Sequence, residues 1–393
     1  MENRVVVRKG RANPLWHGHP WLFSGGVDRI EGQPLAGDAV AVVDVDGRLI
    51  GRGLYSPDSQ IVVRMMTLVD EPIDDALLAR RLDAAIATRR RLGLPSAATN
   101  AYRLVNSEGD GLPGLTIDVF DGTLVVQHTT IGMKRREATL HGLLRERFGS
   151  AAAFTLVEVA PSGVSSIERT GAVTRLLEGK GGIVEARENG LVYEVDPLGG
   201  QKTGMFLDQR DNRRRIAELA SGARVLDVYC YVGGFALNAL AAGAKEAVCV
   251  DSSARAIERC RAHAARNQLG PIEAVEADAF RYLETVRPRS FDLVVLDPPK
   301  FCKSRKDLDA ALRGYERLNL LGLNACADGA ILATASCSQL VDHEQLERVL
   351  TGAARAAGRR VQLLESRFQG PDHPTLPGFV EGRYLKLLIC RVE

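Results

Sequence analysis

Three short stretches in the second half of the chain carry residue types suited to chemistry. A glycine-rich turn begins at Asp227, the tetrad Asp297-Pro-Pro-Lys300 follows, and Cys337 lies 40 residues after Asp297. Each stretch follows an apolar run of the kind that forms a sheet strand. Together they predict an enzyme that binds S-adenosylmethionine and places a thiol against a pyrimidine ring.

The glycine-rich turn is expected to hold the cofactor, because Gly233 and Gly234 let the backbone pass close to a ligand. A dinucleotide site would carry GxGxxG, which this turn lacks, so NAD is disfavoured. Asp251 ends the next expected strand, where a carboxylate can accept both hydroxyls of a ribose. Asp278-Ala279-Phe280 ends the third, where a carboxylate and an aromatic edge suit an adenine. The alternative is that these carboxylates cap the helices that follow them.

The tetrad Asp297-Pro298-Pro299-Lys300 predicts a rigid turn at the substrate side of the site. Proline has no backbone donor, so carbonyls and the Asp297 carboxylate are left to face the ligand. This tetrad occurs widely in enzymes that methylate nucleobases, where such acceptors hold the base edge. The alternative is a stiff connector. The tetrad alone does not separate methylation of an amino nitrogen from methylation of a carbon.

Cys337 favours methylation of a carbon. Carbon 5 of cytosine becomes nucleophilic only after a group adds to carbon 6, and a thiolate can both add and leave. Asp297 would hydrogen-bond and protonate ring nitrogen 3. The alternative for a lone cysteine is a small buried hydrophobe. Cys302 is the rival thiol, which we interpret as a bystander.

The elements around these residues indicate an α/β protein with three domains, at 1–70, 71–195 and 196–393. The first has short β-like runs with a hairpin at Asp46-Gly47, typical of a small β-barrel. The second predicts a small α+β domain, with a hairpin at Asp121-Gly122. In the third, apolar strands alternate with helices, which predicts a parallel sheet covered on both faces. Its expected strands begin at Val225, Ala247, Ile272, Phe291, Ala330, Val361 and Tyr384.

Composition sets modest bounds on function. The chain has 393 residues, 45% of them hydrophobic and 25% charged, with a net charge of +2, so any nucleic-acid surface is local. Its seven cysteines form no CxxC pair, which argues against a disulfide framework or a metal site and fits a reducing cytoplasm. No segment has the ~18 uncharged apolar residues of a membrane span. We therefore expect a cytoplasmic protein with no membrane partner.

At these residues the chain resembles the bacterial 23S rRNA cytosine-5 methyltransferases of the rRNA large subunit methyltransferase I family. The resemblance implies an N-terminal PUA β-barrel, a central small α+β domain and a Rossmann-like class I methyltransferase domain. It also implies 5-methylcytosine in large-subunit rRNA as product, formed through a covalent bond between Cys337 and carbon 6. The stretches that carry it are 103–118, 201–210, 297–301, 313–315 and 336–338.

The resemblance completes the expected site. It places residues 201–210 over the cofactor and makes the N-terminal basic and aromatic residues RNA contacts, although composition alone favours a solvated edge and packed aromatics there. A homodimer is a further expectation. The expected cofactor-binding residues are Phe206, Gln209, Asp227, Tyr229, Gly233, Asp251, Asp278, Ala279, Phe280 and Asp297. The expected RNA-binding residues are Arg8, Lys9, Trp21, Pro298, Pro299, Lys300, Lys303 and Arg305.

One departure and two alternatives stay open. Other cytosine-5 RNA methyltransferases carry a second cysteine in the motif after the fourth strand, and this chain has Lys300 in that place. The residue that helps to release the product is therefore unassigned. The base that removes the proton from carbon 5 is unassigned as well. The first alternative is a guanine-directed rRNA N-methyltransferase, which would not need Cys337. The second is a non-catalytic RNA-binding scaffold, against which an intact Asp297 and Cys337 pair argues.

Overall fold

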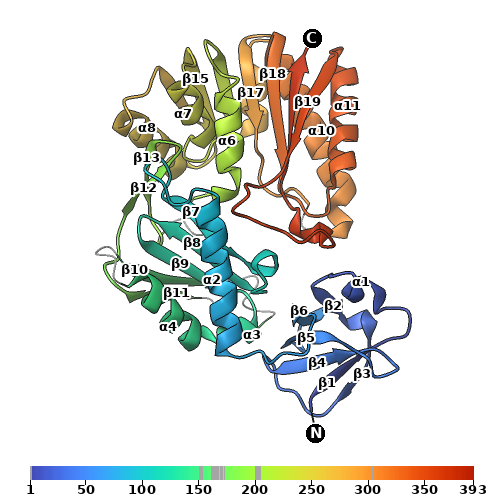
Figure 1. The fold of residues 1–393 in the computed structure, drawn as a ribbon. Coiled ribbons are helices and arrows are strands. Elements are labelled where there is room, and N and C mark those ends of the chain that lie inside the picture. Colours follow the sequence, from blue (N-terminus) through green and yellow to red (C-terminus); the bar gives the residue numbers. More distant parts are fainter. Residues whose placement is uncertain are drawn as a thin grey trace. The chain divides into compact units, whose positions relative to one another are not determined.

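The chain divides into two compact units. The computed structural model describes residues 2–149, 154–160, 168, 171, 173–199, 205–302 and 304–393 (Figure 1). Unit 1 comprises Met1–Gly190, Glu194–Leu207 and Pro371–Gly382, and unit 2 comprises Leu191–Tyr193, Asp208–Gly370 and Arg383–Glu393. The chain therefore leaves and re-enters each unit more than once.

Unit 1 begins with a six-stranded sheet, ordered β2-β6-β5-β4-β1-β3. The predicted hairpin at Asp46-Gly47 is confirmed: it joins the antiparallel strands β4 and β5, and Gly47 has a φ of 81°. Alternate apolar side chains such as Val5, Val7 and Val42 form the core of this sheet. The elements are β1 (Arg4–Val7), α1 (Asn13–Trp16), β2 (Trp21–Phe23), β3 (Val27–Glu31), β4 (Ala39–Val43), β5 (Leu49–Tyr55) and β6 (Ile61–Thr67).

A second sheet of unit 1, ordered β11-β10-β9-β8-β7, carries helices α2 and α4. Asp121 and Gly122 have φ values of 44° and 84°, the left-handed pair that a two-residue hairpin between β8 and β9 requires. The helices pack through Leu77, Leu140 and their neighbours. The elements are α2 (Asp75–Arg91), β7 (Ala101–Asn106), β8 (Leu115–Phe120), β9 (Thr123–His128), α3 (Ile131–Lys134), α4 (Glu137–Phe148), β10 (Thr155–Ala160) and β11 (Val173–Glu178).

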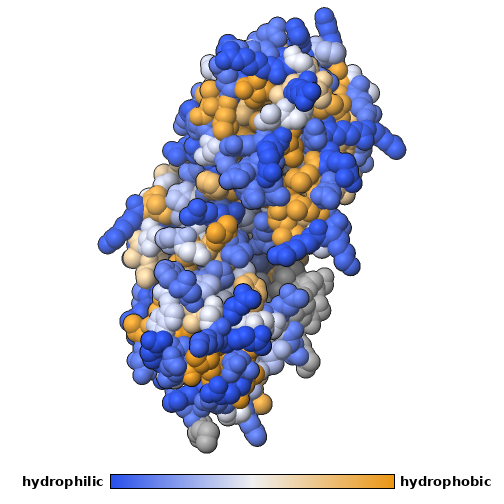
Figure 2. All heavy atoms as spheres, turned by 90° about the vertical axis from the view of Figure 1, so that its right-hand side faces the viewer, coloured by the Kyte–Doolittle hydropathy of each residue, from blue (hydrophilic) through white to orange (hydrophobic). Residues whose placement is uncertain are grey.

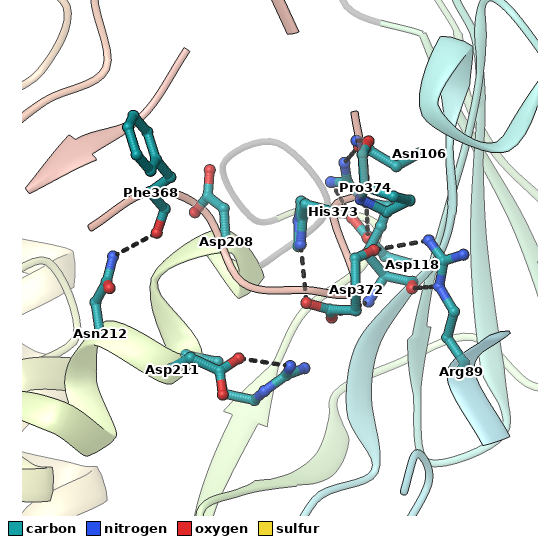
Figure 3. A network of polar contacts seen from close by, with 12 residues as sticks. Arg89, Asn106, Asp118, Asp208, Asp211, Asn212, Phe368, Asp372, His373 and Pro374 are labelled. Carbon is teal, nitrogen blue, oxygen red and sulfur yellow. Dashed lines mark hydrogen bonds and ion pairs between the residues drawn. The ribbon is translucent and has the colours of Figure 1, made fainter. Parts of the chain in front are cut away.

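A buried arginine fixes residues 371–382 within unit 1 (Figure 3). Arg89 of α2 pairs with Asp110 (Nη1–Oδ1, 2.5 Å) and donates through Nη2 to the carbonyl of Asp372 (2.7 Å). His373 Nδ1 lies 3.1 Å from the Asp372 carboxylate. A buried charge is tolerated only when it is paired and hydrogen-bonded, so this network holds a segment distant in sequence against α2.

Unit 2 contains a seven-stranded sheet, ordered β16-β15-β14-β17-β18-β20-β19. All seven predicted strands are present. Its strands are β14 (Arg224–Val228), β15 (Glu246–Asp251), β16 (Ile272–Glu276), β17 (Phe291–Leu296), β18 (Cys326–Ser336), β19 (Val361–Arg367) and β20 (Lys386–Val392). A separate two-stranded sheet pairs β12 (Val184–Glu188), which belongs to unit 1, with β13 (Leu191–Val195), whose residues are assigned partly to each unit.

Helices cover both faces of this sheet, because successive residues of each strand point to opposite sides. Leu226 and Val228 of β14 join the core beneath α9, α10 and α11, whereas Val225 joins the core beneath α6, α7 and α8. The predicted α/β fold class is thereby confirmed. The helices are α6 (Arg210–Ala217), α7 (Gly234–Ala241), α8 (Ala254–Arg266), α9 (Ala279–Thr285), α10 (Leu308–Ala325) and α11 (His343–Ala357).

The expectation of a wholly parallel sheet is wrong for the last strand. β20 runs antiparallel to both β18 and β19, between which it is inserted. No α-helix separates β19 from β20, so the chain turns back without the crossover that a parallel neighbour requires. The result is a mixed sheet whose final strand is interior.

Hydrophilic side chains cover most of the face drawn in Figure 2, with apolar patches between them. In the part of the chain that the structure describes, none of the helices has both the length and the apolar composition of a membrane span.

Candidate active site

The glycine-rich turn and the Asp297 tetrad follow the two strands between which the strand order of unit 2 reverses. From β14 the chain builds outward through β15 and β16, then returns to place β17 on the other side of β14. In sheets of this kind, ligands bind beyond the carboxyl ends of the strands at such a point. Val228 lies opposite Leu296, and the Asp297 backbone N–H donates to the Val228 carbonyl (3.3 Å). The glycine-rich turn and the Asp297 tetrad are therefore adjacent.

The turn after β14 stores backbone strain. Tyr229, Tyr231 and Gly233 have φ values of 63°, 50° and 82°, and the first two are residues that rarely adopt this conformation. A Cβ on Gly233 would lie 2.5 Å from Cys260 Sγ, and a Cβ on Gly234 would lie 2.5 Å from Arg213 Nε. Glycine is therefore needed at position 233, where the positive φ and Cys260 both disfavour a side chain, while a side chain at position 234 would have to displace Arg213. The approach of this turn to a ligand stays a prediction.

Asp251 braces this turn from the neighbouring strand. Its Oδ2 accepts from the Tyr231 backbone N–H and its Oδ1 from the Ser253 backbone N–H, both at 2.9 Å. The side chain is half-buried at the end of β15. The carboxylate thus holds the strained turn and reaches the edge where a ribose would lie.

Asp227 supports the turn from beneath. Its carboxylate is fully buried, and Oδ2 accepts from the Ala236 backbone N–H (3.0 Å). Oδ1 has no hydrogen-bond partner among the residues described. Burial raises the pKa of Asp227 to about 8, with smaller contributions from Cys260 and Asp297. Asp227 is therefore placed to position the turn from within the protein.

The raised pKa of Asp227 has a measurable consequence. Its ordinary value is 3.8, so the neutral carboxyl favours the folded state below that pH, and this contribution is lost as the pH rises through about 8. Asp227→Asn keeps an acceptor for Ala236 without the ionisation. We expect the free energy of unfolding of the wild type to fall between pH 5 and 8.5 relative to that of the variant, in urea titrations. Parallel pH profiles would contradict this assignment.

Asp278 caps the helix that follows it, as the alternative interpretation proposed. Its Oδ1 accepts from the Arg281 backbone N–H at the start of α9 (3.0 Å), and the side chain is exposed. Ala279 is buried in the apolar core. Phe280 stacks on Phe301 with ring centroids 6.3 Å apart. The geometry leaves an adenine contact at Phe280 as a prediction.

A chain of amide hydrogen bonds orients the Asp297 carboxylate. Gln209 Nε2 donates to Asp297 Oδ2 (3.1 Å), and Asn212 Nδ2 donates to Gln209 Oε1 (2.6 Å). Arg367 Nε donates to Asn212 Oδ1 (3.0 Å), while Asn212 Nδ2 also reaches the Phe368 carbonyl (3.1 Å, Figure 3). Each donor fixes the orientation of the next amide, so the Gln209 NH₂ group must face Asp297. Phe206 is half-buried in unit 1, and its cofactor contact stays a prediction.

Cys337 is the half-buried member of an otherwise buried segment. Tyr315 of α10 hydrogen-bonds through its hydroxyl to Ser336 Oγ and to Ser338 Oγ, both at 3.0 Å. The segment is thereby fixed on both sides of the cysteine. Cys337 Sγ lies 4.0 Å from the Pro298 carbonyl of the tetrad. The structure therefore brings the predicted thiol and the predicted acceptor turn together.

The other six cysteines, all in the described part of the chain, are buried. Cys302 donates its thiol to the Ser304 carbonyl (3.3 Å), and burial raises the pKa of that thiol. A buried thiol with a raised pKa is a poor nucleophile at neutral pH, which favours Cys302 as a bystander.

Among the residues that the structure describes, two groups of potential metal ligands have ligand atoms within 4.8 Å of one another, namely Cys230, Cys249 and Cys260 in unit 2 and His128, Glu137 and His141 in unit 1. The three thiols are members of the apolar core under α7 and α8, which fits small packed hydrophobes. In the second group Lys134 Nζ already pairs with Glu137 (2.6 Å). Neither group of side chains takes part in the chemistry expected of Asp297 and Cys337.

The predicted RNA contacts have mixed environments. Lys300, Pro299 and Arg305 are exposed near the tetrad, while Pro298 is buried and Lys303 lies outside the described residues. In unit 1, Arg8 and Lys9 are exposed.

Trp21 is packed rather than open. Its Nε1 donates to Glu108 (2.8 Å), and its ring meets Phe379 edge-on at 4.6 Å. This favours the packed-aromatic alternative for Trp21. The RNA-contact assignments of the other residues stay predictions.

Sequence reasoning gave no role in the site to four residues that shape it: Asn212, Tyr315, Arg367 and Lys386. Signals existed for two of them, because Tyr315 ends the stretch 313–315 that carries the resemblance, and Lys386 interrupts the apolar run from Leu385 to Ile389. A lysine inside a buried strand is rare unless it is paired, so its position alone could have marked it.

Comparisons with known proteins agree with this geometry. A PUA-like domain family matches residues 5–68, and the S-adenosylmethionine-dependent methyltransferase family matches residues 111–373. Proteins named ribosomal RNA large subunit methyltransferase I from Tolumonas auensis and Escherichia coli are each 39% identical, over 100% of both chains. An S-adenosylmethionine-dependent methyltransferase structure from Streptococcus mutans superposes with a TM-score of 0.84 at 20% identity, over 100% of both chains. A methyltransferase structure with bound SAH gives 0.86 at 20% identity, with the same coverage.

S-adenosylmethionine fits the edge described above. The glycine-rich turn follows β14 at the carboxyl end of the sheet, and Asp251 places a carboxylate at the end of the neighbouring strand. The glycine-rich turn and Asp251 would hold the cofactor, beside Gln209 and Asp297. The cofactor is S-adenosylmethionine, and the chain belongs to the ribosomal RNA large subunit methyltransferase I family within the S-adenosylmethionine-dependent methyltransferases.

Proposed function

We propose that this protein methylates carbon 5 of a cytosine in large-subunit rRNA, with Cys337 as the nucleophile. The observation that carries the proposal is the position of Cys337. It is the cysteine of the described chain that is not buried, and it lies 4.0 Å from the carbonyl of Pro298 in the tetrad. The names of the full-length relatives support the choice of large-subunit rRNA as substrate.

The side chains divide the chemistry between them. The Cys337 thiolate adds to carbon 6 of the ring, which makes carbon 5 nucleophilic, and it leaves again when the proton on carbon 5 is lost. Asp297, oriented by Gln209, acts in its protonated form: it donates to ring nitrogen 3 and gives it the proton as the thiolate adds, which neutralises the negative charge that develops there. When bound, S-adenosylmethionine supplies the methyl group.

RNA is the partner that this function requires. Lys300 of the tetrad and Arg305, five residues further along the chain, are exposed and would contact phosphates. Arg317 of α10 contacts other protein side chains: it pairs with Glu284 (2.5 Å) and lies over the Phe280 ring. A cytoplasmic location and a homodimer remain predictions.

Deleting the gene should remove one 5-methylcytosine from large-subunit rRNA, as measured by mass spectrometry of its nucleosides. Complementation with the wild-type gene should restore the modification, and complementation with Cys337→Ser should not. Loss of a methylated guanine instead would favour the guanine-directed alternative. Unchanged nucleosides would favour a binding scaffold.

A further inference from the structure

A lysine is buried in the sheet beside the proposed nucleophile. Lys386 begins β20 and is 3% exposed, while Leu387 to Cys390 after it are fully buried. Its backbone lies opposite Ser336 in the antiparallel register of β18 and β20. Opposed residues of an antiparallel pair present their side chains on the same face. Lys386 is therefore level with the residue that precedes Cys337.

The hydrogen bonds of Lys386 reach the residue that follows Cys337. Its Nζ donates to the carbonyl of Ser338 (2.7 Å) and to the carbonyl of Tyr384 (2.9 Å). An ammonium has three donors, and the third has no acceptor among the residues described. Both acceptors are neutral, so these bonds do not balance the buried charge. Burying an ammonium is costly without a nearby anion.

Three ionisable groups act on this ammonium: Cys337, Asp342 and Lys300. Burial lowers the pKa of Lys386 to about 8, and Cys337 opposes that change most strongly, followed by Asp342. Asp342 is exposed and caps α11 through the Gln345 backbone N–H (2.8 Å). Lys300 is exposed and repels. Cys337 is thus the neighbour whose ionisation would balance the charge of Lys386 within the protein.

Tyr315 and Lys386 together determine how Cys337 is presented. Tyr315 fixes Ser336 and Ser338 from α10, and Lys386 fixes the Ser338 carbonyl from β20. The residues on either side of Cys337 are held, so the position of its Cα and the direction of its Cα–Cβ bond are fixed.

We propose that Lys386 is a positioning residue that holds Cys337 as a thiolate. The thiol gives its proton to solvent, and the sulfur anion takes the Lys386 ammonium as its counter-ion. No bond forms to Lys386. The inference rests on the proposed role of Cys337 as nucleophile, and it names the group that activates it.

The test is the pH dependence of alkylation of Cys337 by iodoacetamide, followed by peptide mapping on the folded full-length protein. The thiolate displaces iodide and forms a thioether, so the rate reports the fraction ionised. Lys386→Met keeps the length of the side chain and removes its charge. We expect the alkylation midpoint to rise by about one pH unit or more, with roughly tenfold slower reaction at pH 7. Lys386→Arg should restore part of the rate.

Lys300→Met is the matched control, because it removes an exposed lysine that acts on the same group. It should move the midpoint much less than Lys386→Met. Equal midpoints in wild type and Lys386→Met, with both proteins folded by circular dichroism, would overturn the proposal. So would an equal shift in both variants, because general surface charge would then explain it.

The same experiment separates this inference from the proposed function. If the alkylation midpoint shifts in Lys386→Met but the wild type forms no 5-methylcytosine, the role of Lys386 is supported and the proposed reaction is wrong. If the wild type forms 5-methylcytosine through Cys337 but the midpoint does not shift in Lys386→Met, the proposed reaction is supported and the role of Lys386 is wrong.

Discussion

Cys337→Ser should lose methyl transfer by on the order of 10³-fold or more, the scale expected when a covalent nucleophile is removed. Serine is similar in shape, but its hydroxyl is far less nucleophilic than a thiolate. Because Cys337 is half-buried and its flanking serines carry the hydrogen bonds to Tyr315, the substitution should leave the fold intact. Affinity for S-adenosylmethionine by calorimetry and for RNA by filter binding should be unchanged.

RNA that contains 5-fluorocytosine gives a direct view of the intermediate. Fluorine blocks the proton loss that releases the product, so the wild type should accumulate a covalent complex visible on a denaturing gel. The complex should require both S-adenosylmethionine and Cys337, and peptide mapping should find the link on that residue.

Cys302→Ser is the matched control for both experiments, since Cys302 is the other cysteine close to the tetrad. It should trap RNA and transfer methyl groups as the wild type does. A link at Cys302, or full activity in Cys337→Ser, would remove Cys337 from the mechanism. Activity in Cys337→Ser without any adduct in the wild type would favour the guanine-directed alternative.

Gly233→Ala should weaken cofactor binding by at least about tenfold, or ~1.4 kcal/mol. The new Cβ would lie 2.5 Å from Cys260 Sγ, and alanine would have to adopt the φ of 82°. A left-handed alanine alone costs roughly 1–2 kcal/mol. The turn should therefore relax away from the geometry that approaches the ligand, which calorimetry with S-adenosylmethionine would measure.

Two further variants isolate the cause. Gly243 has a φ of 93°, so Gly243→Ala has a similar backbone cost, but its Cβ would meet nothing closer than 3.9 Å. Gly243 precedes β15 and so lies at the amino ends of the strands, away from the cofactor site. It should bind cofactor normally. Adding Cys260→Ala to Gly233→Ala removes the clashing sulfur and should recover part of the affinity. Equal losses for Gly233→Ala and Gly243→Ala would mean that the turn has no special role.

Most strands of unit 2 were predictable because each contains a short apolar run, as in Leu293-Val-Val-Leu296 of β17. The strand Val27–Glu31 was not predicted, because it is short, mostly polar and largely exposed. The direction of β20 was also beyond the sequence, since an apolar run indicates a strand but not its orientation. The direction of β20 is set by the connection that precedes this strand and by its pairing with β18.

The site divides in the same way. Asp227, Asp251 and Asp297 could be predicted because each follows an apolar run, and parallel strands bring such ends to one edge. Asn212 and Arg367, which orient Gln209, meet only in the folded unit. No local pattern marks residues that are 155 positions apart.

The interior place of β20 affects how the protein is made. It follows β19 in the sequence, yet it separates β18 from β19 and carries Lys386. During synthesis β18 and β19 emerge first, but they lack their shared neighbour until residues 386–392 have left the ribosome. The sheet can close only after that point, so a copy that lacks β20 would expose two strand edges. Cys337 would then lack the Lys386 side chain, so the proposed counter-ion would reach the thiol only after β20 has joined the sheet.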